Sequence, residues 1–211
     1  MIIAIDGLGV NGKSTLAKMI SEYLNYKNFN TGAIYRCITL KILEEKLDIN
    51  DIQNVIENLK NININFDNNK VLLDGIDVTN KIRTEEVSVF STKWATIPEI
   101  KKFVRKIQKE YLEKYDTVIE GRDIGTRIAP NAEFRFYLYS DFETRVSRLW
   151  KQNTDINIET IRKNLQIRDD LDINGGNFVK PENAIEIDTT NYSIQEVFEI
   201  MINYITKNSK I

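Results

Sequence analysis

Residues 1–14 read MIIAIDGLGVNGKS, an apolar run that leads into a glycine-rich turn, a lysine and a serine. Gly7, Gly12, Lys13 and Ser14 satisfy the G-x-x-x-x-G-K-[ST] pattern of a phosphate-binding loop. The residues that follow repeat apolar side chains at helical spacing on one face. The stretch therefore predicts a strand, a phosphate-binding loop and a helix, in this order.

The predicted loop would hold a polyphosphate through its backbone and a lysine. Glycines let N–H groups turn inward around the phosphates, and the positive end of the helix dipole adds to their attraction. We expect Lys13 to reach the β- and γ-phosphates and Ser14 to be the protein ligand of Mg²⁺. The loop residues expected to bind the nucleotide are Gly7, Leu8, Gly9, Val10, Asn11, Gly12, Lys13, Ser14 and Thr15. The loop alone leaves kinases, ATPases, GTPases and switches open as alternatives.

The composition is that of a globular protein with one core. Of the 211 residues, 42% are hydrophobic and 28% are charged. The 29 basic and 31 acidic residues leave a net charge of −2, so no global field favours nucleic acid or a membrane surface. No apolar run approaches the ~18 residues of a membrane span, and Asp6 interrupts the apolar start too early for a signal peptide. We therefore expect a cytoplasmic protein with no nucleic-acid or membrane partner.

Two residue types limit the chemistry. A single cysteine, Cys37, excludes an internal disulfide and a multi-cysteine zinc site. The chain has no histidine, which removes every mechanism that needs an imidazole as base or ligand. The chemistry must therefore depend on arginine, lysine, carboxylates and a metal ion.

Strand and helix patterns alternate along most of the chain, which predicts an α/β fold with a central parallel sheet. Beyond the loop, strands are expected at residues 28–30, 117–119, 134–139 and 184–187, and helices at 31–46, 51–59, 98–115 and 194–205. Between them, residues 61–67 alternate apolar and polar side chains, and turns at 68–69 and 74–75 separate two more short apolar runs. This part predicts a small three-stranded antiparallel insert.

The expected strand at 117–119 ends in chemically active residues. Glu120, Arg122 and Asp123 follow it directly. The carboxyl ends of parallel strands meet at one edge of the sheet, so these side chains should face the phosphate loop. The alternative is that Arg122 and Asp123 form an ion pair with a structural role only.

Two arginine-bearing helices are expected after residue 140. Arg145 and Arg148 lie three residues apart on one helical face, where they would meet developing phosphoryl charge. Arg168 and Asp172 share a face of the next helix, and glycines at 175–176 follow as a hinge. Helices joined by a polar turn in this way predict a lid that excludes water when closed. The alternative is an ordinary helical hairpin with surface salt bridges.

Five short motifs behind the phosphate loop resemble those of the bacterial cytidylate kinase family. They are TGAIYR at 31–36, IRT at 82–84, GRDIGT at 121–126, RDDLD at 168–172 and DTT at 188–190. The resemblance covers nearly the whole chain, and the expected insert stands where that family carries its extended CMP-binding subdomain. It implies a single P-loop kinase domain over residues 1–211. The acceptor-binding subdomain would span about 31–97 and the helical lid about 149–176.

The resemblance also implies an activity, the reversible transfer of the γ-phosphoryl group of ATP to CMP or dCMP with Mg²⁺, by a monomer. Such a reaction suits a site without histidine, because phosphoryl transfer depends mainly on positioning and charge stabilisation. The residues that the resemblance implies for catalysis are Lys13, Arg122, Arg145, Arg148 and Arg168.

The acceptor nucleotide would be held at its phosphate and its sugar. By the resemblance, Arg36 and Arg122 would hold the acceptor phosphate, and Tyr35 would line the site. Arg168 with Asp172 would contact the sugar. The residues implied for acceptor binding as a whole are Thr31, Tyr35, Arg36, Thr92, Lys101, Arg122, Asp123, Arg168 and Asp172.

The two bases would be read by separate groups. By the resemblance, Asp123 and Thr92 would read the cytosine, whose exocyclic amine would donate to the carboxylate. The adenine of ATP would be bordered by Asp188, Thr189 and Thr190.

Some positions depart from the family's pattern. Thr31, Thr92 and Lys101 are mild changes of a serine, a serine and an arginine, whereas Gly175 stands in place of an arginine that helps to hold the nucleotide. The lid is also shorter than usual. Losing one charge-assisted contact would cost ~1.5 to 3 kcal/mol. The departures therefore predict weaker CMP binding or a shifted acceptor preference.

Three alternatives follow from these observations. The nearest is a kinase of the same fold that acts on UMP or another pyrimidine nucleotide. A GTP-driven switch would need an N-K-x-D guanine reader, and residues 80–83 (NKIR) fail at the last position. A nucleic-acid-dependent ATPase would need a basic surface, for which the basic side of the 98–115 helix is weak support.

Overall fold

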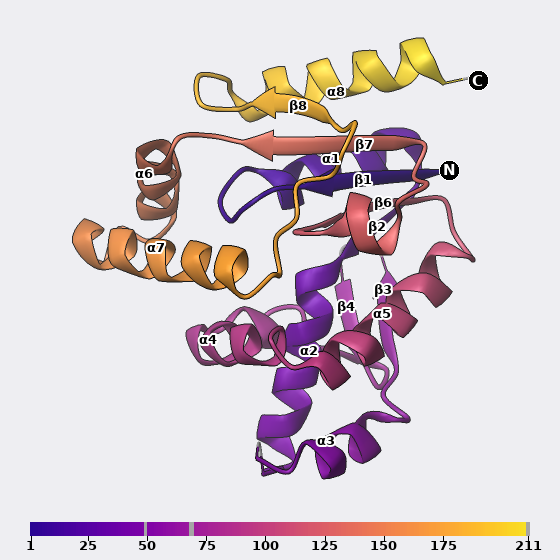
Figure 1. Ribbon diagram of the computed structural model, residues 1–211, viewed down its shortest axis with the longest axis vertical. Helices are drawn as coiled ribbons and strands as arrows, with labels where there is room; N and C mark the ends of the chain where they lie inside the picture. Colours follow the sequence, from indigo (N-terminus) through magenta and orange to yellow (C-terminus); the bar gives the residue numbers. More distant parts are fainter. Residues whose placement is uncertain (49, 68–69, 210–211) are drawn as a thin grey trace. The chain divides into compact units, whose positions relative to one another are not determined.

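The computed structural model describes residues 1–48, 50–67 and 70–209 (Figure 1). The chain divides into two compact units. The first unit joins residues 1–27 to 116–211, and the second comprises residues 28–115. None of the helices in residues 1–48, 50–67 and 70–209 combines the length and the apolar character of a membrane span.

The first unit is built on a parallel sheet. Its strands are β1 (Ile2–Asp6), β6 (Thr117–Gly121), β7 (Phe134–Tyr139) and β8 (Ile185–Asp188), and the sheet order is β2-β6-β1-β7-β8. Strand β2 (Lys27–Asn30) begins at the last residue of the first segment, where the Lys27 N–H donates to the Asp116 carbonyl at 2.9 Å. The predicted central parallel sheet is confirmed, with β1 paired to both β6 and β7.

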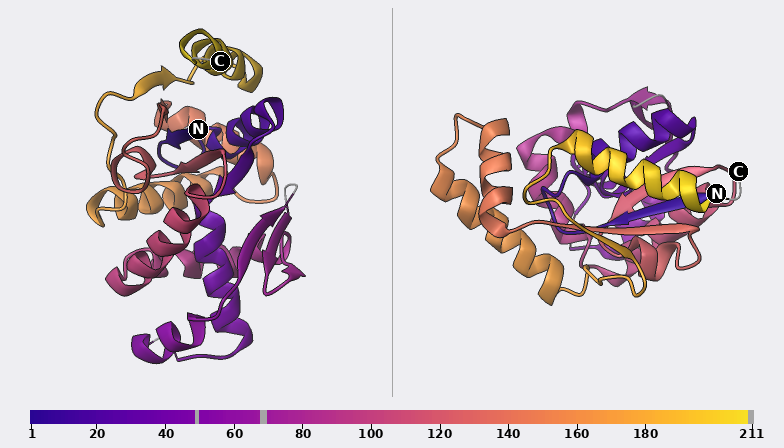
Figure 2. Two further views of the ribbon diagram at one scale, coloured as in Figure 1. Left: turned by 90° about the vertical axis from the view of Figure 1, so that its right-hand side faces the viewer. Right: turned by 90° about the horizontal axis from the view of Figure 1, so that it is seen from above.

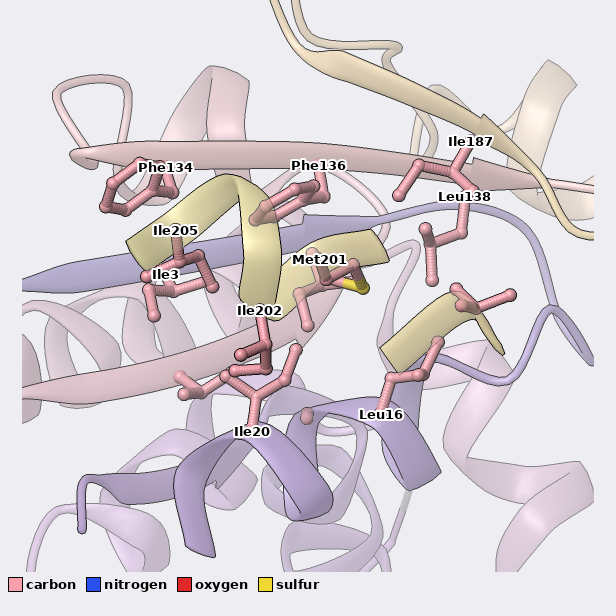
Figure 3. Close-up of a cluster of buried hydrophobic side chains, with 14 residues drawn as sticks. Ile3, Leu16, Ile20, Phe134, Phe136, Leu138, Ile187, Met201, Ile202 and Ile205 are labelled. Atoms are coloured by element: carbon pink, nitrogen blue, oxygen red, sulfur yellow. The ribbon is translucent and has the colours of Figure 1, made fainter. Parts of the chain in front are cut away.

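Helices complete this unit. They are α1 (Lys13–Leu24), α6 (Phe142–Gln152), α7 (Ile158–Asn174) and α8 (Ile194–Asn208). Helices α1 and α8 cover the sheet and share one core with it: Leu16 and Ile20 of α1 and Met201 of α8 lie with Ile3 and Phe136 of the strands (Figure 3). Helices α6 and α7 lie side by side and pack on each other (Figures 1 and 2). A short π-helical turn, Ile124–Ile128, follows β6.

The second unit combines helices with a small antiparallel sheet. Its elements are α2 (Thr31–Glu44), α3 (Ile52–Leu59), β3 (Ile64–Asp67), β4 (Lys70–Leu73), β5 (Ile76–Asp77), a 3₁₀ turn at Lys81–Arg83, α4 (Glu85–Trp94) and α5 (Pro98–Leu112). The sheet order β3-β4-β5 confirms the predicted three-stranded insert. The predicted turn at 68–69 lies outside the described residues.

An aromatic cluster fixes the insert to the helices of this unit. The Phe29 ring stacks on Tyr111 of α5 at 4.2 Å and meets the edge of Phe66 of β3 at 4.7 Å. Such ring pairs stabilise the fold by more than the burial of their apolar area alone. Helix α5 ends at Leu112, three residues before the predicted end, with the N–H of its cap, Glu113, donating to Lys109.

Candidate active site

The phosphate-binding loop connects β1 to α1, as the sequence predicts. Its backbone takes the left-handed conformation at Val10 (φ 65°) and at Gly12 (φ 79°), the residue that precedes α1. Strand β7 passes so close that a Cβ on Gly7 would lie 2.2 Å from the Leu138 carbonyl oxygen. The first glycine of the motif is therefore required by close packing, whereas Gly12 is required by its backbone angle.

Lys13 is a buried cation at the start of α1. Lys13 is only 5% exposed, and its Nζ donates to the Leu8 carbonyl at 2.7 Å. Burial and the neighbouring Arg122 cation lower the pKa of Lys13 to about 7, against the attraction of Glu120 and Asp6. Within the described part of the chain, no carboxylate is paired with this ammonium. A polyphosphate would supply the missing negative charge.

Ser14 and Glu120 form a hydrogen-bonded pair beside the phosphate loop. The Ser14 hydroxyl donates to Glu120 Oε1 at 2.9 Å, and Glu120 lies at the end of β6, beside β1. In the described residues, no group of three or more acidic, cysteine or histidine side chains could hold a metal ion by itself. A hydroxyl beside a carboxylate fits Mg²⁺ in the manner of a nucleotide site, where phosphates and water supply most ligands.

Asp6 is a site residue that sequence reasoning missed. It is fully buried at the end of β1, and its two carboxylate oxygens accept the N–H groups of Ile124 at 2.6 Å and Gly125 at 2.7 Å. Burial raises the pKa of Asp6 to about 6, although these two N–H donors oppose the rise. The signal available in the sequence was a carboxylate at the end of an otherwise apolar buried strand. Asp6 ties the turn after β6 to the strand that carries the phosphate loop.

The turn after β6 places Arg122 against α7. Arg122 Nε lies 2.6 Å from Asp172 Oδ2, so the acidic end of the RDDLD motif holds this arginine. The next residue, Asp123, pairs with Arg127 at 3.3 Å. The predicted position of these residues at the carboxyl edge of the sheet is confirmed, because Gly121 is paired in register with Asp6.

Arg122 and Arg168 converge on the phosphate loop. A Cβ added to Gly9 would lie 3.6 Å from Arg122 Nη2 and 3.9 Å from Arg168 Nη2. Arg122 comes from the turn after β6 and Arg168 from α7, so two separate elements bring a guanidinium to the loop at Gly9. Together with Lys13, they place three cationic side chains around one short stretch of backbone.

Helix α6 contributes two arginines whose partners the sequence did not predict. Arg145 Nη2 lies 2.6 Å from Asp169 Oδ2, both side chains are 6% exposed, and Arg145 Nη1 donates to the Gly9 carbonyl at 3.3 Å. Arg148 donates to the Thr189 hydroxyl at 3.0 Å and also to the Thr189 carbonyl. Arg145 therefore holds the phosphate loop, and Arg148 holds the turn predicted to border the adenine.

That turn is also fixed by its own hydrogen bonds. The Thr190 N–H donates to Asp188 Oδ1 at 2.9 Å, and the Thr189 N–H donates to the Tyr139 carbonyl at 2.7 Å. The Asp141 N–H donates to the Thr190 hydroxyl at 3.0 Å. The turn at 188–190 is thus a defined edge of the first unit.

Gly175 ends α7. Its N–H donates to the Leu171 carbonyl at 3.0 Å, and a Cβ at this position would lie 2.4 Å from the same oxygen. The helix end in this form accepts no side chain at position 175. The backbone at the end of α7 therefore favours a glycine at position 175.

The remaining predicted acceptor residues lie in the second unit. Thr31, Tyr35 and Arg36 lie in the first turns of α2, where the Asn30 side chain accepts the Ala33 N–H at 2.9 Å. Lys101 lies half-buried in α5. The side chain of Thr92, in α4, lies outside the described part of the structure. Helix α2 packs on both α4 and α5, so the three helices that carry these predicted residues lie together in the second unit.

Comparisons with known proteins agree with this geometry. Residues 3–207 match a family model described as cytidylate kinase. A cytidylate kinase of Bacillus subtilis is 38% identical over 218 residues, which cover 99% of this chain and 97% of that protein. A cytidylate kinase of Caldanaerobacter subterraneus is 36% identical over 214 residues, with 99% and 96% covered. A shikimate kinase structure from Bacteroides thetaiotaomicron covers 98% of both chains with a TM-score of 0.52 at 9% identity, a likeness of fold alone.

Proposed function

Because the chain belongs to the cytidylate kinase family of nucleoside monophosphate kinases, we propose that it phosphorylates CMP and dCMP with ATP and Mg²⁺. The products would be CDP, dCDP and ADP, and the transfer is reversible. The observation that carries the proposal is the gathering of three cationic side chains at the phosphate loop, with Arg122 and Arg168 near Gly9 and Lys13 at the Leu8 carbonyl. Phosphoryl transfer needs such charge stabilisation and positioning, and little acid–base chemistry.

In this mechanism Lys13 holds the β- and γ-phosphates against the loop backbone. Its buried ammonium donates to a carbonyl with one proton, which leaves two for phosphate oxygens. Ser14 would hold Mg²⁺, which when bound neutralises charge on the phosphates. Asp188, Thr189 and Thr190 border the adenine, in the position that Arg148 fixes.

In this proposal the acceptor is held at its phosphate and at its sugar. Arg122 and Arg36 hold the acceptor phosphate, with Thr31 and Tyr35 lining the site. Arg168 and Asp172 contact the sugar. Asp172 already holds Arg122 at 2.6 Å, so the same carboxylate would orient the phosphate-binding arginine.

Base selection is assigned to three further residues. By the family resemblance, Asp123 and Thr92 would read the amine edge of cytosine, and Lys101 would contribute to base binding. A carboxylate can only accept, so it favours an exocyclic amine over a carbonyl oxygen. The proposal thus gives a physical reason for preferring CMP over UMP.

The proposal extends to the organisation of the chain. One kinase domain over residues 1–211 would act as a monomer, with an acceptor-binding subdomain at about 31–97 and a lid at about 149–176. The packed pair α6 and α7 supports the lid. Arg145 and Arg148 of α6 would meet the developing phosphoryl charge, and each also has a protein partner, Asp169 for Arg145 and Thr189 for Arg148.

A second candidate is a kinase of the same fold for UMP or another pyrimidine nucleotide. The observation that favours it is Gly175, where the backbone at the end of α7 leaves no room for an arginine side chain. A nucleotide that relies less on this contact would then bind better. A coupled assay of ADP release with CMP, dCMP, UMP, dUMP, AMP and GMP in parallel tests both candidates. Preference for CMP or dCMP supports the first, preference for UMP or dUMP the second, and no reaction with any of them contradicts both.

A further inference from the structure

Arg127 is a charged residue that none of the roles above uses. It lies in the π-helical turn Ile124–Ile128, where its N–H donates to the Asp123 carbonyl at 2.9 Å. Its Nη1 lies 3.3 Å from Asp123 Oδ2 and donates to the Gly176 carbonyl at 2.7 Å. The guanidinium therefore bridges the Asp123 carboxylate and the segment that follows α7.

Asp123 is fixed from two sides by this arrangement. The backbone just after it is held by Asp6, which accepts the Ile124 and Gly125 N–H groups. Its carboxylate is held by Arg127, which is itself anchored on Gly176. The Asp123 side chain keeps 21% of its surface exposed, so a ligand can still reach it. A carboxylate with a fixed orientation and an open edge is suited to recognition.

The charge of this carboxylate decides which group it accepts. An ionised carboxylate offers lone pairs only, so it binds an amine and repels a carbonyl oxygen. The same position on the pyrimidine ring carries an amine in cytosine and a carbonyl oxygen in uracil. A carboxylate that is free to rotate would lose part of this discrimination, because its lone pairs would no longer be held toward the amine.

We propose that Arg127 is a specificity-determining residue that positions Asp123 as a pure acceptor and so favours an amine-bearing base over a carbonyl-bearing one. The inference rests on the proposed function, since it takes Asp123 as the group that reads the acceptor base. Arg127 acts through Asp123 and is a positioning residue. Its ion pair is partly exposed, so its effect is expected in selection and not in folding.

The test is the ratio of kcat/KM for CMP to kcat/KM for UMP, at saturating ATP and Mg²⁺, in Arg127→Gln. We expect the ratio to fall by about tenfold, the size of one oriented hydrogen bond to a charged group, mainly through a higher KM for CMP. The KM for ATP should not change. Arg127→Lys keeps the charge beside Asp123 and should restore most of the ratio.

Arg135→Gln is the matched control. Arg135 also donates to a backbone carbonyl, that of Pro130 at 2.9 Å, and lies against the same turn near Gly125. It has no assigned role at the site, so its loss should leave the ratio unchanged. Equal losses for CMP and UMP in Arg127→Gln would show a merely structural role and overturn the proposal, as would an unchanged or higher ratio.

Failure of the inference and failure of the proposed function are distinguishable. If the unaltered enzyme shows no preference for CMP over UMP, the proposed function fails, and with it the selection by Asp123. If it prefers CMP and Arg127→Gln keeps that preference, only the role of Arg127 fails.

Discussion

Lys13 and Arg145 are both buried cations beside the phosphate loop, but they differ in what balances their charge. Arg145 is paired with Asp169 at 2.6 Å, whereas Lys13 donates to the Leu8 carbonyl, has no carboxylate partner among the described residues and has its pKa lowered to about 7. A buried cation that has a carboxylate partner is satisfied by the protein itself. A buried cation without one costs free energy until an anion arrives. The difference separates a cation that the protein itself neutralises from one that awaits a ligand.

The largest effect expected from this comparison is on folding. Arg145→Ala would leave the Asp169 carboxylate buried without its partner, which costs about 3–5 kcal/mol. Urea unfolding measures the loss. Replacing both partners, as Arg145→Met with Asp169→Leu, should restore most of the stability. Arg162→Ala is the control, because Arg162 makes exposed ion pairs with Glu143 and Glu159 and its loss should leave the unfolding midpoint almost unchanged. A stable Arg145→Ala protein would break the comparison.

Lys13→Met should lower activity and raise stability, the opposite of the effect on stability expected for Arg145→Ala. Removing the cation that holds the donor phosphates should lower kcat by about 10²–10³-fold. Stability should rise, because a buried ammonium is replaced by an apolar side chain of similar length. The pKa of Lys13 is lowered from 10.5 to about 7 in the folded protein, so the gain should be full below pH 7 and vanish as the pH rises towards 10.5. A destabilised variant in urea at pH 6.5 would contradict the account.

Asp6→Asn extends the comparison to a buried carboxylate, Asp6, beside the same loop. The amide offers an NH₂ group to one of the two N–H donors that Asp6 now accepts, so the turn at 121–128 should shift. We expect KM for CMP to rise about tenfold and KM for ATP to change less. Steady-state kinetics with each substrate varied in turn measure both. A rise in KM for ATP alone would show that Asp6 serves the phosphate loop and not the acceptor side.

The same residue gives a pH dependence with a defined sign. The pKa of Asp6 is raised from 3.8 to about 6, so its contribution to stability is greatest below pH 3.8 and is lost as the pH rises through 6. Between pH 4 and 7, the free energy of unfolding of Asp6→Asn should therefore rise relative to that of the unaltered protein. Parallel curves over this range would mean that Asp6 titrates normally.

The elements with local signals could be predicted from the sequence. The spacing of Gly7, Gly12 and Lys13 gave the phosphate loop, and the alternation in residues 61–67 gave the antiparallel insert. Side-chain partners could not be predicted in the same way. Asp6 meets Ile124 across 118 positions of sequence, a contact that depends on the sheet order. The Arg145–Asp169 pair likewise depends on how α6 packs on α7.

The most direct test of the central claim is proton uptake when ATP and Mg²⁺ bind at pH 8, measured by calorimetry in buffers of different ionisation enthalpy. In the free protein the pKa of Lys13 is about 7, so the side chain is mostly neutral at this pH. Phosphate oxygens should raise that pKa and draw in close to one proton per site, and Lys13→Met should abolish the uptake. Binding without proton uptake, or equal uptake by Lys13→Met, would contradict the assignment of Lys13 as the cation that awaits the nucleotide.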